Sequence, residues 1–198
     1  PNELIKIPTH GAVNLHVSLL PKYRGAAPIQ WALMSGEKET GVTIFQISEK
    51  VDTGDILAQE KFPIFDDDTM LSLGTRLCNF GADIILDTID KIENGSIRSV
   101  KQNRGIATFA PKITKEMRFI DWSWPCTKIH NWVRGLSPYP CMYTTFNGKV
   151  LKVFKTFIEK GSEYRPGAVF KIDNDSILVG TGEGLLGLLE IQLEGKKK

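Results

Sequence analysis

Three polar residues in the first part of the chain have side chains suited to acyl-transfer chemistry. Asn14 and His16 fall within residues 11–20, where apolar and polar residues alternate with the period of a β-strand. Residues two apart in a strand share a face, so we expect both side chains on one side of it. Asp52 follows a second alternating stretch, residues 42–47, in a glycine-containing turn that can reach the same edge of the sheet.

These residue types fit proton transfer and oxyanion stabilisation. A carboxylate beside an imidazole orients the ring and influences its charge. Asn14 can donate its amide N–H to a developing oxyanion while His16 moves a proton. Because no protein nucleophile accompanies them, the three residues suit an acyl transfer in which the acceptor itself attacks.

The same residues also have plainer interpretations. His16 can be a half-buried histidine and Asn14 a polar residue at a strand end, while Asp52 can belong to an ordinary charged turn. Ser18 lacks the G-x-S-x-G turn of a serine hydrolase. His10 and His16 have neither helical spacing nor a third ligand, so we expect no metal.

The elements that must position these residues are strands and helices in alternation. The sequence predicts strands over 11–20, 42–47 and 56–64, a helix over 29–35, and a long helix from the acidic run Asp66–Thr69 to Glu93. Pro28 favours a helix start and Asn94-Gly95 a helix end. Residues 1–95 are therefore predicted to form an α/β layered domain.

The second part of the chain has a different pattern. Residues 96–117 lack periodicity and are predicted to be a linker. Residues 118–198 carry a short helix over 126–135 and five short strands, at 143–146, 149–158, 169–172, 177–179 and 185–193. The first two strands flank Asn147-Gly148, a strong hairpin signal. We expect a small, OB-like β-barrel.

Composition excludes several classes of protein. The 198 residues are 41% hydrophobic and 24% charged, as in a folded globular protein, and no run of about 18 apolar residues suggests a membrane span. The three cysteines form no C-x-x-C pair, which favours a reducing compartment. Residues 1–111 hold 11 basic and 14 acidic residues, whereas residues 112–198 hold 14 and 9. Chance can explain this split, but it also fits a second domain that approaches a polyanion.

Several motifs together resemble the folate-dependent formyltransferases. They are Asn14–Pro21, Tyr23–Ile29, Glu39–Thr43 and Asp52–Asp55, at matching spacing. Within that family, later motifs resemble the members that act on methionyl initiator tRNA: Ala110–Ile113, Ile120–Trp122, Pro138–Pro140 and Gln192–Lys197. The similarity covers essentially the whole chain.

The resemblance implies transfer of a formyl group from 10-formyltetrahydrofolate to the amine of methionyl initiator tRNA. It assigns catalysis to Asn14, His16 and Asp52, and folate contacts to Ser18, Leu19, Leu20 and Pro21. It implies a partial, Rossmann-like catalytic domain in residues 1–95 and a tRNA-binding barrel in residues 118–198. We expect a monomer without metal or membrane association, in the bacterial cytoplasm or, alternatively, an organelle matrix.

Two departures from the family pattern stand out. Val17 occupies a position where the family commonly has a small residue or proline. The catalytic motif also begins at residue 14, whereas the family places a Rossmann-type half before it. We therefore predict that the chain is a fragment that binds folate weakly and turns over slowly or not at all.

Two other functions stay open. A related formyltransferase or formyl hydrolase can use the same residues on another acceptor, such as an amino-sugar nucleotide. A non-catalytic module that binds tRNA or folate is the third possibility. The aromatic residues Trp122, Trp124, Trp132 and Tyr139 are expected to pack at the junction between the domains rather than to stack on bases.

Overall fold

A computed structural model describes residues 2–5, 7–159, 161, 165–173 and 175–197. Pro1 and Lys198, which end the predicted domains, lie outside the described residues. The chain divides into two compact units, and each is described by itself. The first unit contains residues 1–32, 37–66 and 72–112, and the second contains residues 33–36, 67–71 and 113–198.

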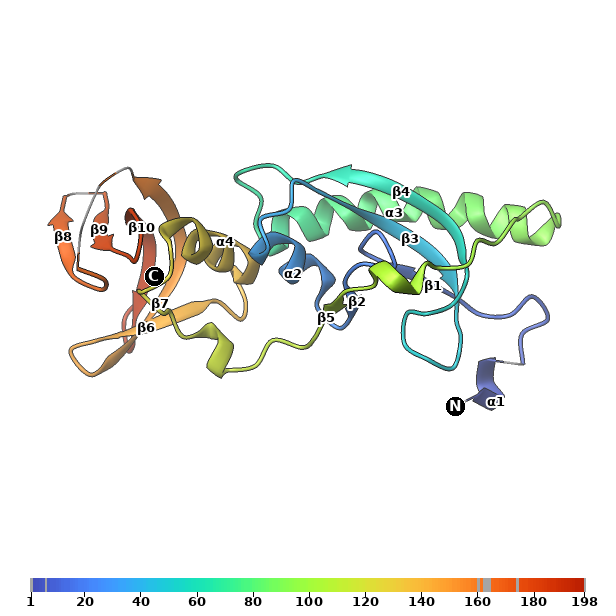
Figure 1. The fold of residues 1–198 in the computed structure, drawn as a ribbon, viewed down its shortest axis with the longest axis horizontal. Coiled ribbons are helices and arrows are strands. Elements are labelled where there is room, and N and C mark those ends of the chain that lie inside the picture. The colour runs from blue at the N-terminus through green and yellow to red at the C-terminus, as the bar shows by residue number, and fades with distance from the viewer. Residues whose placement is uncertain (1, 6, 160, 162–164, 174, 198) are drawn as a thin grey trace. The chain divides into compact units, whose positions relative to one another are not determined.

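The first unit is built on a three-stranded antiparallel sheet in the order β1-β3-β4 (Figure 1). Its strands are β1 (Val13–His16), β3 (Glu39–Gln46) and β4 (Ile56–Pro63). The central strand β3 is buried from Thr40 to Phe45, because it has a neighbour on either side. The sequence predicted all three strands, but β1 ends at His16 instead of Leu20, and β3 begins at Glu39 instead of Val42. The Rossmann-like character stays a prediction, since these described strands pair only antiparallel.

Helix α3 (Met70–Glu93) packs on one face of this sheet. Its buried side includes Leu73, Leu77 and Gly81. A Cβ atom added to Gly81 would lie 2.8 Å from Leu15 Cδ1, so this glycine permits the close approach of helix and sheet. Glycine in a helix interior normally weakens it, and here packing against the strand supplies the reason for it.

The remaining elements of the first unit are short. They are α1 (Asn2–Ile5), β2 (Arg24–Gly25), α2 (Pro28–Met34), η1 (Arg104–Ile106) and β5 (Phe109–Ala110). Strands β2 and β5 pair in parallel. Residues 100–110, which fall in the predicted linker, lie against this unit, because Val100 also forms a bridge with Ile56. The predicted domain boundaries themselves stay predictions.

The second unit contains a five-stranded antiparallel sheet in the order β6-β7-β10-β9-β8. Its strands are β6 (Met142–Phe146), β7 (Lys149–Glu159), β8 (Val169–Ile172), β9 (Ile177–Gly180) and β10 (Leu185–Leu193). Helix α4 (Cys126–Leu136) contacts β7 and β10 and buries Ile129, Val133 and Leu136. A short η2 turn (Glu116–Arg118) precedes it.

The sheet of the second unit is not shown to close into a barrel. Among the described residues, no ladder joins β6 to β8, the two strands at its edges. The OB-like barrel therefore stays a prediction. Backbone hydrogen bonds connect the turn before β10 to the start of α4, from Gly182 N to Trp124 O and from Cys126 N to Glu183 O. Residues 182–187 spell G-x-G-x-x-G, but they lead into a strand and not into the helix that a dinucleotide-binding turn requires.

Candidate active site

His16 and Asp52, predicted from the sequence as partners, lie together in the first unit. His16 ends strand β1 and is 6% exposed, and Asp52 lies in the β3–β4 connection and is 9% exposed. Their closest atoms, His16 Nδ1 and Asp52 Oδ2, are 3.7 Å apart. The other ring nitrogen, Nε2, lies 2.9 Å from the Tyr23 carbonyl oxygen. Because a carbonyl can only accept, Nε2 carries the hydrogen in this contact.

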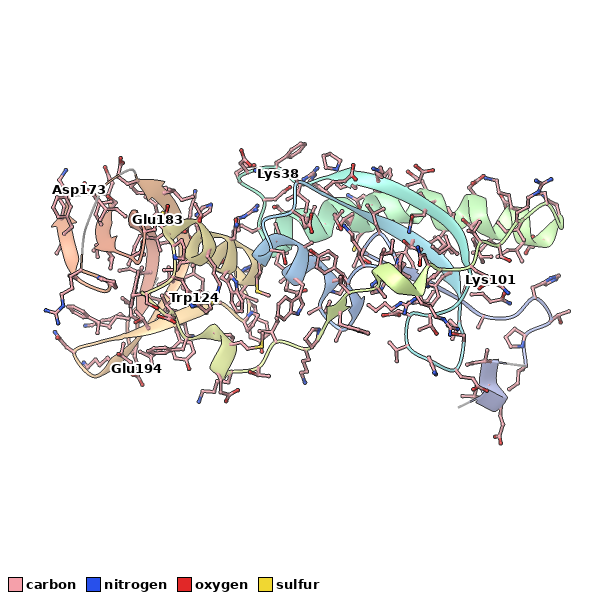
Figure 2. The ribbon with its side chains drawn as sticks, viewed as in Figure 1. Lys38, Lys101, Trp124, Asp173, Glu183 and Glu194 are labelled. Carbon is pink, nitrogen blue, oxygen red and sulfur yellow. The ribbon has the colours of Figure 1, made fainter. Side chains whose placement is uncertain are left out.

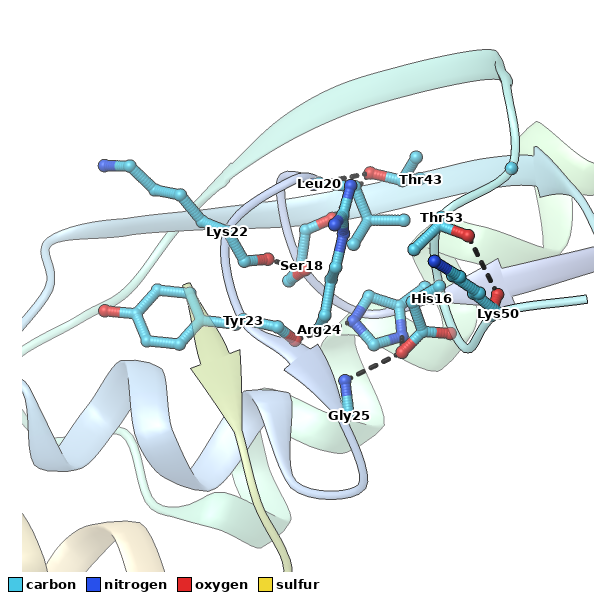
Figure 3. A network of polar contacts seen from close by, with 12 residues as sticks. His16, Ser18, Leu20, Lys22, Tyr23, Arg24, Gly25, Thr43, Lys50 and Thr53 are labelled. Atoms are coloured by element: carbon cyan, nitrogen blue, oxygen red, sulfur yellow. Dashed lines mark hydrogen bonds and ion pairs between the residues drawn. The ribbon is translucent and has the colours of Figure 1, made fainter. Parts of the chain in front are cut away.

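The same Asp52 oxygen that lies nearest to His16 also accepts a backbone hydrogen bond. Gly25 N donates to Asp52 Oδ2 over 2.7 Å, as Figure 3 shows. Gly25 has φ +125°, and a Cβ atom there would lie 2.6 Å from the Ala110 carbonyl oxygen, so only glycine fits this close approach. Asp52 itself has φ 53°, an unusual left-handed conformation for a residue with a side chain.

Asn14 lies on the same strand as His16 but is exposed. Its backbone is opposite Phe45 in the β1–β3 ladder. Residues two apart share a strand face, so the exposed amide and the buried imidazole project on the same side of β1. A molecule in solution can therefore contact Asn14 directly, whereas most of the His16 side chain is shielded from it.

The segment predicted to contact folate, Ser18–Pro21, forms a tight loop directly after β1. Ser18 is fully buried and its hydroxyl donates to Lys22 O over 2.7 Å, while Leu20 is 3% exposed (Figure 3). Pro21 is also buried and follows a cis peptide bond, and Leu19 is half-buried. The side chains of this loop are therefore largely enclosed, and the Leu19 carbonyl accepts a hydrogen bond from Lys22 N.

Two further side chains fix that loop. Thr43 Oγ1 donates to Ser18 O over 2.6 Å and accepts from Leu20 N over 3.2 Å. Gln59 Nε2 donates to Leu20 O over 2.9 Å and lies 2.8 Å from Thr43 Oγ1. Thr43 was visible in the sequence only within the family motif, and Gln59 carried no signal there at all.

Arg24 and Gln102 complete the polar network around Asp52. Arg24 is 7% exposed, and its Nη2 and Nε donate to Gln102 Oε1 over 2.6 and 3.2 Å. Burial lowers the pKa of the Arg24 guanidinium, the charge of Arg104 lowers it further, and Asp52 raises it. Sequence reasoning missed Gln102 because it lies in the aperiodic segment between the two predicted domains.

A cavity of about 460 Å³ lies next to the Asp52 turn. Its lining includes Lys50, Thr53, Asp55 and Arg104, so both signs of charge are present. Among the described residues, no group of three or more His, Cys, Asp or Glu side chains could hold a metal ion. In the same part of the chain, none of the helices is both long and apolar enough to cross a bilayer.

Comparison with known proteins identifies the family. Residues 1–89 match the family model for formyl transferase, and residues 112–198 match the model for the formyl transferase C-terminal domain. The methionyl-tRNA formyltransferase of Caldanaerobacter subterraneus is 45% identical over 199 aligned residues, and that of Thermodesulfovibrio yellowstonii is 48% identical over 197. All of this chain is covered in both alignments, but only 64% and 63% of the relatives.

Solved structures share the fold at lower sequence identity. A complex of HypX from Aquifex aeolicus with tetrahydrofolic acid matches 93% of this chain and 32% of that one, with a TM-score of 0.71 and 23% identity. An N-formyltransferase from Helicobacter canadensis, in complex with folinic acid and dTDP-3-aminofucose, matches 91% of this chain and 66% of that one, with a TM-score of 0.72 and 23% identity. Methionyl-tRNA formyltransferase from Clostridium thermocellum matches 98% and 72%, with a TM-score of 0.68 and 20% identity.

These matches confirm the resemblance carried by the sequence motifs. Both family models and the relatives agree, and together the two models account for residues 1–89 and 112–198. The chain spans about 64% of the length of the first of those relatives. The chain belongs to the formyltransferase family.

Proposed function

We propose that this chain carries the catalytic residues of an enzyme that transfers a formyl group from 10-formyltetrahydrofolate to the amine of methionyl initiator tRNA. The observation that carries the proposal is the buried pair of His16 and Asp52, 3.7 Å apart, in which His16 shares strand β1 with the exposed Asn14. The relatives of 45% and 48% identity bear the name of that activity.

The loop Ser18–Pro21 offers a fit for the folate co-substrate. Its backbone is held rigidly by Thr43 and Gln59 and lies directly after His16. We assign the folate contacts to this loop because it follows the strand that carries Asn14 and His16.

Bound 10-formyltetrahydrofolate supplies the formyl carbon, to which the acceptor amine forms a new C–N bond while the bond from that carbon to folate N10 breaks. Asn14 donates an amide N–H to the negative charge that develops on the formyl oxygen. His16 accepts, at Nδ1, the proton that the amine loses, because Nε2 already donates its hydrogen to the Tyr23 carbonyl, and it returns a proton to the leaving nitrogen. Asp52 orients the imidazole and balances its positive charge, and it is itself fixed by Gly25 N.

The second unit is proposed to bind the tRNA. Residues 112–198 carry 14 basic against 9 acidic residues, and phosphate contacts by Lys and Arg dominate affinity for nucleic acids. The finer features implied by the family belong to the same proposal: a Rossmann-like catalytic domain, an OB-like C-terminal domain, a monomeric state and a bacterial cytoplasmic location.

Formyl transfer to two acceptors tests the function. The assay supplies 10-formyltetrahydrofolate with either methionyl initiator tRNA or an amino-sugar nucleotide, using the 198-residue chain and the full-length product of its gene. We expect formylmethionyl-tRNA from the full-length protein and little or none from the chain alone. Formylation of the sugar nucleotide alone would establish the second candidate, which the Helicobacter canadensis structure favours.

A variant connects the activity to the site. Asn14→Ala in the full-length protein is expected to lower the rate about 10²–10³-fold, the usual cost of one lost oxyanion donor. Asn79→Ala is the matched control, because Asn79 is an exposed amide on helix α3. Equal rates for the two variants would contradict the assignment of Asn14.

A further inference from the structure

We propose that Gln102 is a positioning residue that holds the Asp52 turn in the geometry in which the carboxylate faces His16. The inference rests on the proposed function, because it deepens the account of the same site. Gln102 is half-buried and precedes η1, far in sequence from both catalytic residues. None of the motifs that identify the family contains it.

The side-chain nitrogen of Gln102 binds the turn directly. Nε2 donates to Asp52 O over 3.1 Å and to Gly54 O over 2.7 Å. An amide nitrogen has two hydrogens, so these two carbonyls use its full donor capacity. One acceptor is the carbonyl of Asp52 itself, the residue whose backbone is left-handed with φ 53°, and the other lies two residues further along the turn. Gln102 therefore stabilises the left-handed backbone conformation of Asp52, which residues with a side chain adopt only rarely.

The side-chain oxygen of Gln102 binds the segment on the other side of the carboxylate. Oε1 accepts from Nη2 and Nε of Arg24 over 2.6 and 3.2 Å. Arg24 is followed by Gly25, whose N–H donates to Asp52 Oδ2 over 2.7 Å. One glutamine thus joins the backbone of Asp52 to the segment that holds the Asp52 side chain. These hydrogen bonds surround the Asp52 carboxylate with contacts to both its backbone and its side chain.

Gln102 is not needed to attach its own segment to the first unit. Val100 and Ile56 exchange two backbone hydrogen bonds of 2.8 Å. Further along, Arg24 N donates to Thr108 O over 2.9 Å, where β2 and β5 pair. The segment is therefore fastened both before and after Gln102. Loss of the glutamine contacts should release the Asp52 turn while the segment stays docked.

The chain contains a matched control in Gln59. Its Nε2 donates to Leu20 O and lies beside Thr43 Oγ1, so it holds the Ser18–Pro21 loop as Gln102 holds the Asp52 turn. Each glutamine has one backbone amide that reports on its loop. Gly25 N–H reports on Asp52, and Leu20 N–H, which donates to Thr43 Oγ1 over 3.2 Å, reports on the folate loop.

Amide hydrogen exchange by NMR on the 15N-labelled 198-residue chain tests the inference. In Gln102→Leu, we expect the Gly25 amide to exchange about tenfold faster while Leu20 changes by less than about twofold. Gln59→Leu should give the reverse pattern. The Val100 amide, which reports on docking of the segment, should keep its protection in both variants.

A second variant separates the two ends of the glutamine. Gln102→Glu keeps an acceptor for Arg24 but cannot donate to the carbonyls of Asp52 and Gly54, so it too should expose the Gly25 amide. If the Val100 and Gly25 amides both lose protection, Gln102 only attaches its own segment to the first unit, and the proposal is overturned. So would unchanged Gly25 exchange in both Gln102 variants.

The kinetics of formyl transfer provide a second test that is independent of hydrogen exchange. In the full-length enzyme, Gln102→Leu should lower kcat about 10–100-fold with little change in the KM for 10-formyltetrahydrofolate, whereas Gln59→Leu should raise that KM. A parent enzyme without formyl transfer would refute the proposed function alone, because the exchange pattern needs no activity. A released Gly25 amide with unchanged kcat would refute the positioning role alone.

Discussion

Among the described residues, Tyr23, Asp52, Cys141 and Asn147 have side chains and a left-handed backbone, and the turns at Asp52 and Asn147 are stabilised in different ways. Asn147, in the β6–β7 hairpin, has φ 49°, and Asp52, between β3 and β4, has φ 53°. The Asn147-Gly148 turn directly joins the paired residues Phe146 and Lys149. The Asp52 turn has a local hydrogen bond from Thr53 Oγ1 to Lys50 O, but it is also held by Gly25 and Gln102, residues distant in sequence.

The hairpin turn is stabilised by the backbone preferences of its own residues, whereas the Asp52 turn also depends on contacts with residues distant in sequence. A Cβ atom added to Gly148 would meet nothing within 4 Å, whereas one added to Gly54 would lie 1.6 Å from the Gln46 carbonyl oxygen. The hairpin turn needs only residues that tolerate φ > 0. The Asp52 turn needs a complete environment, and that environment is what brings a carboxylate to a histidine.

Exchanging a carboxylate for an amide at Asp52, and the reverse at Asn147, should give the largest difference in the rate of formyl transfer. Asp52→Asn removes the negative charge beside His16 and should lower formyl transfer about 10²-fold or more. Asn147→Asp makes the opposite exchange at an exposed hairpin and should leave the rate unchanged. Rates of formyl transfer in the full-length enzyme measure both. A small loss in Asp52→Asn would mean that orientation of His16 does not need the charge.

Adding one methyl group to the glycine of each turn should produce the next largest difference. Gly54→Ala forces a Cβ into the Gln46 carbonyl and should reduce the free energy of unfolding by about 3 kcal/mol. Gly148→Ala has open space but φ +75°, so we expect a cost of about 1 kcal/mol. Urea unfolding of the 198-residue chain measures both values. A larger cost at Gly148 would reverse the comparison.

The two turns also show which parts of the molecule could be predicted from sequence. The Asn147-Gly148 hairpin and the end of α3 before Asn94-Gly95 were predicted correctly, because residues at those positions have strong local preferences. The site pair His16 and Asp52 was predicted from residue types and a family motif, and the structure places them together. Gln102 was not predictable, because a side-chain amide that binds distant carbonyls leaves no periodic pattern.

Replacing only the left-handed residue of the hairpin tests the local explanation. Asn147→Gly should change the free energy of unfolding by less than about 0.5 kcal/mol, since glycine adopts φ > 0 freely. Asn147→Ala should cost about 1 kcal/mol, because alanine does not. Thermal or urea unfolding distinguishes them. Equal stability of the two variants would show that something other than backbone preference holds this turn.

A third turn, after β8, should show the smallest effect, one confined to acid pH. Asp173 is labelled in Figure 2. Its Oδ1 accepts hydrogen bonds from Asp175 N, Ser176 Oγ and Ser176 N, which together lower the pKa of this carboxyl. A lowered pKa in the folded chain means that the contribution to stability is present above the unfolded value, near 3.9, and is lost as pH falls through the folded value.

Carboxyl 13C NMR of the folded chain measures that titration. The midpoint for Asp173 should lie below that of an aspartate in an unstructured peptide, and the Ser176 amide should move with it. Asn at position 173 keeps one acceptor oxygen, so Asp173→Asn should abolish the pH dependence of the Ser176 amide while retaining the turn. A midpoint at or above the peptide value would contradict the hydrogen-bond explanation.

The most direct test of the account is a double-mutant cycle on His16 and Asp52 in formyl transfer by the full-length enzyme. If Asp52 acts through His16, as their 3.7 Å contact indicates, the double variant His16→Ala with Asp52→Ala should be no slower than His16→Ala alone. If the two losses instead multiply, the residues act independently, and the central claim that they work as one unit is wrong.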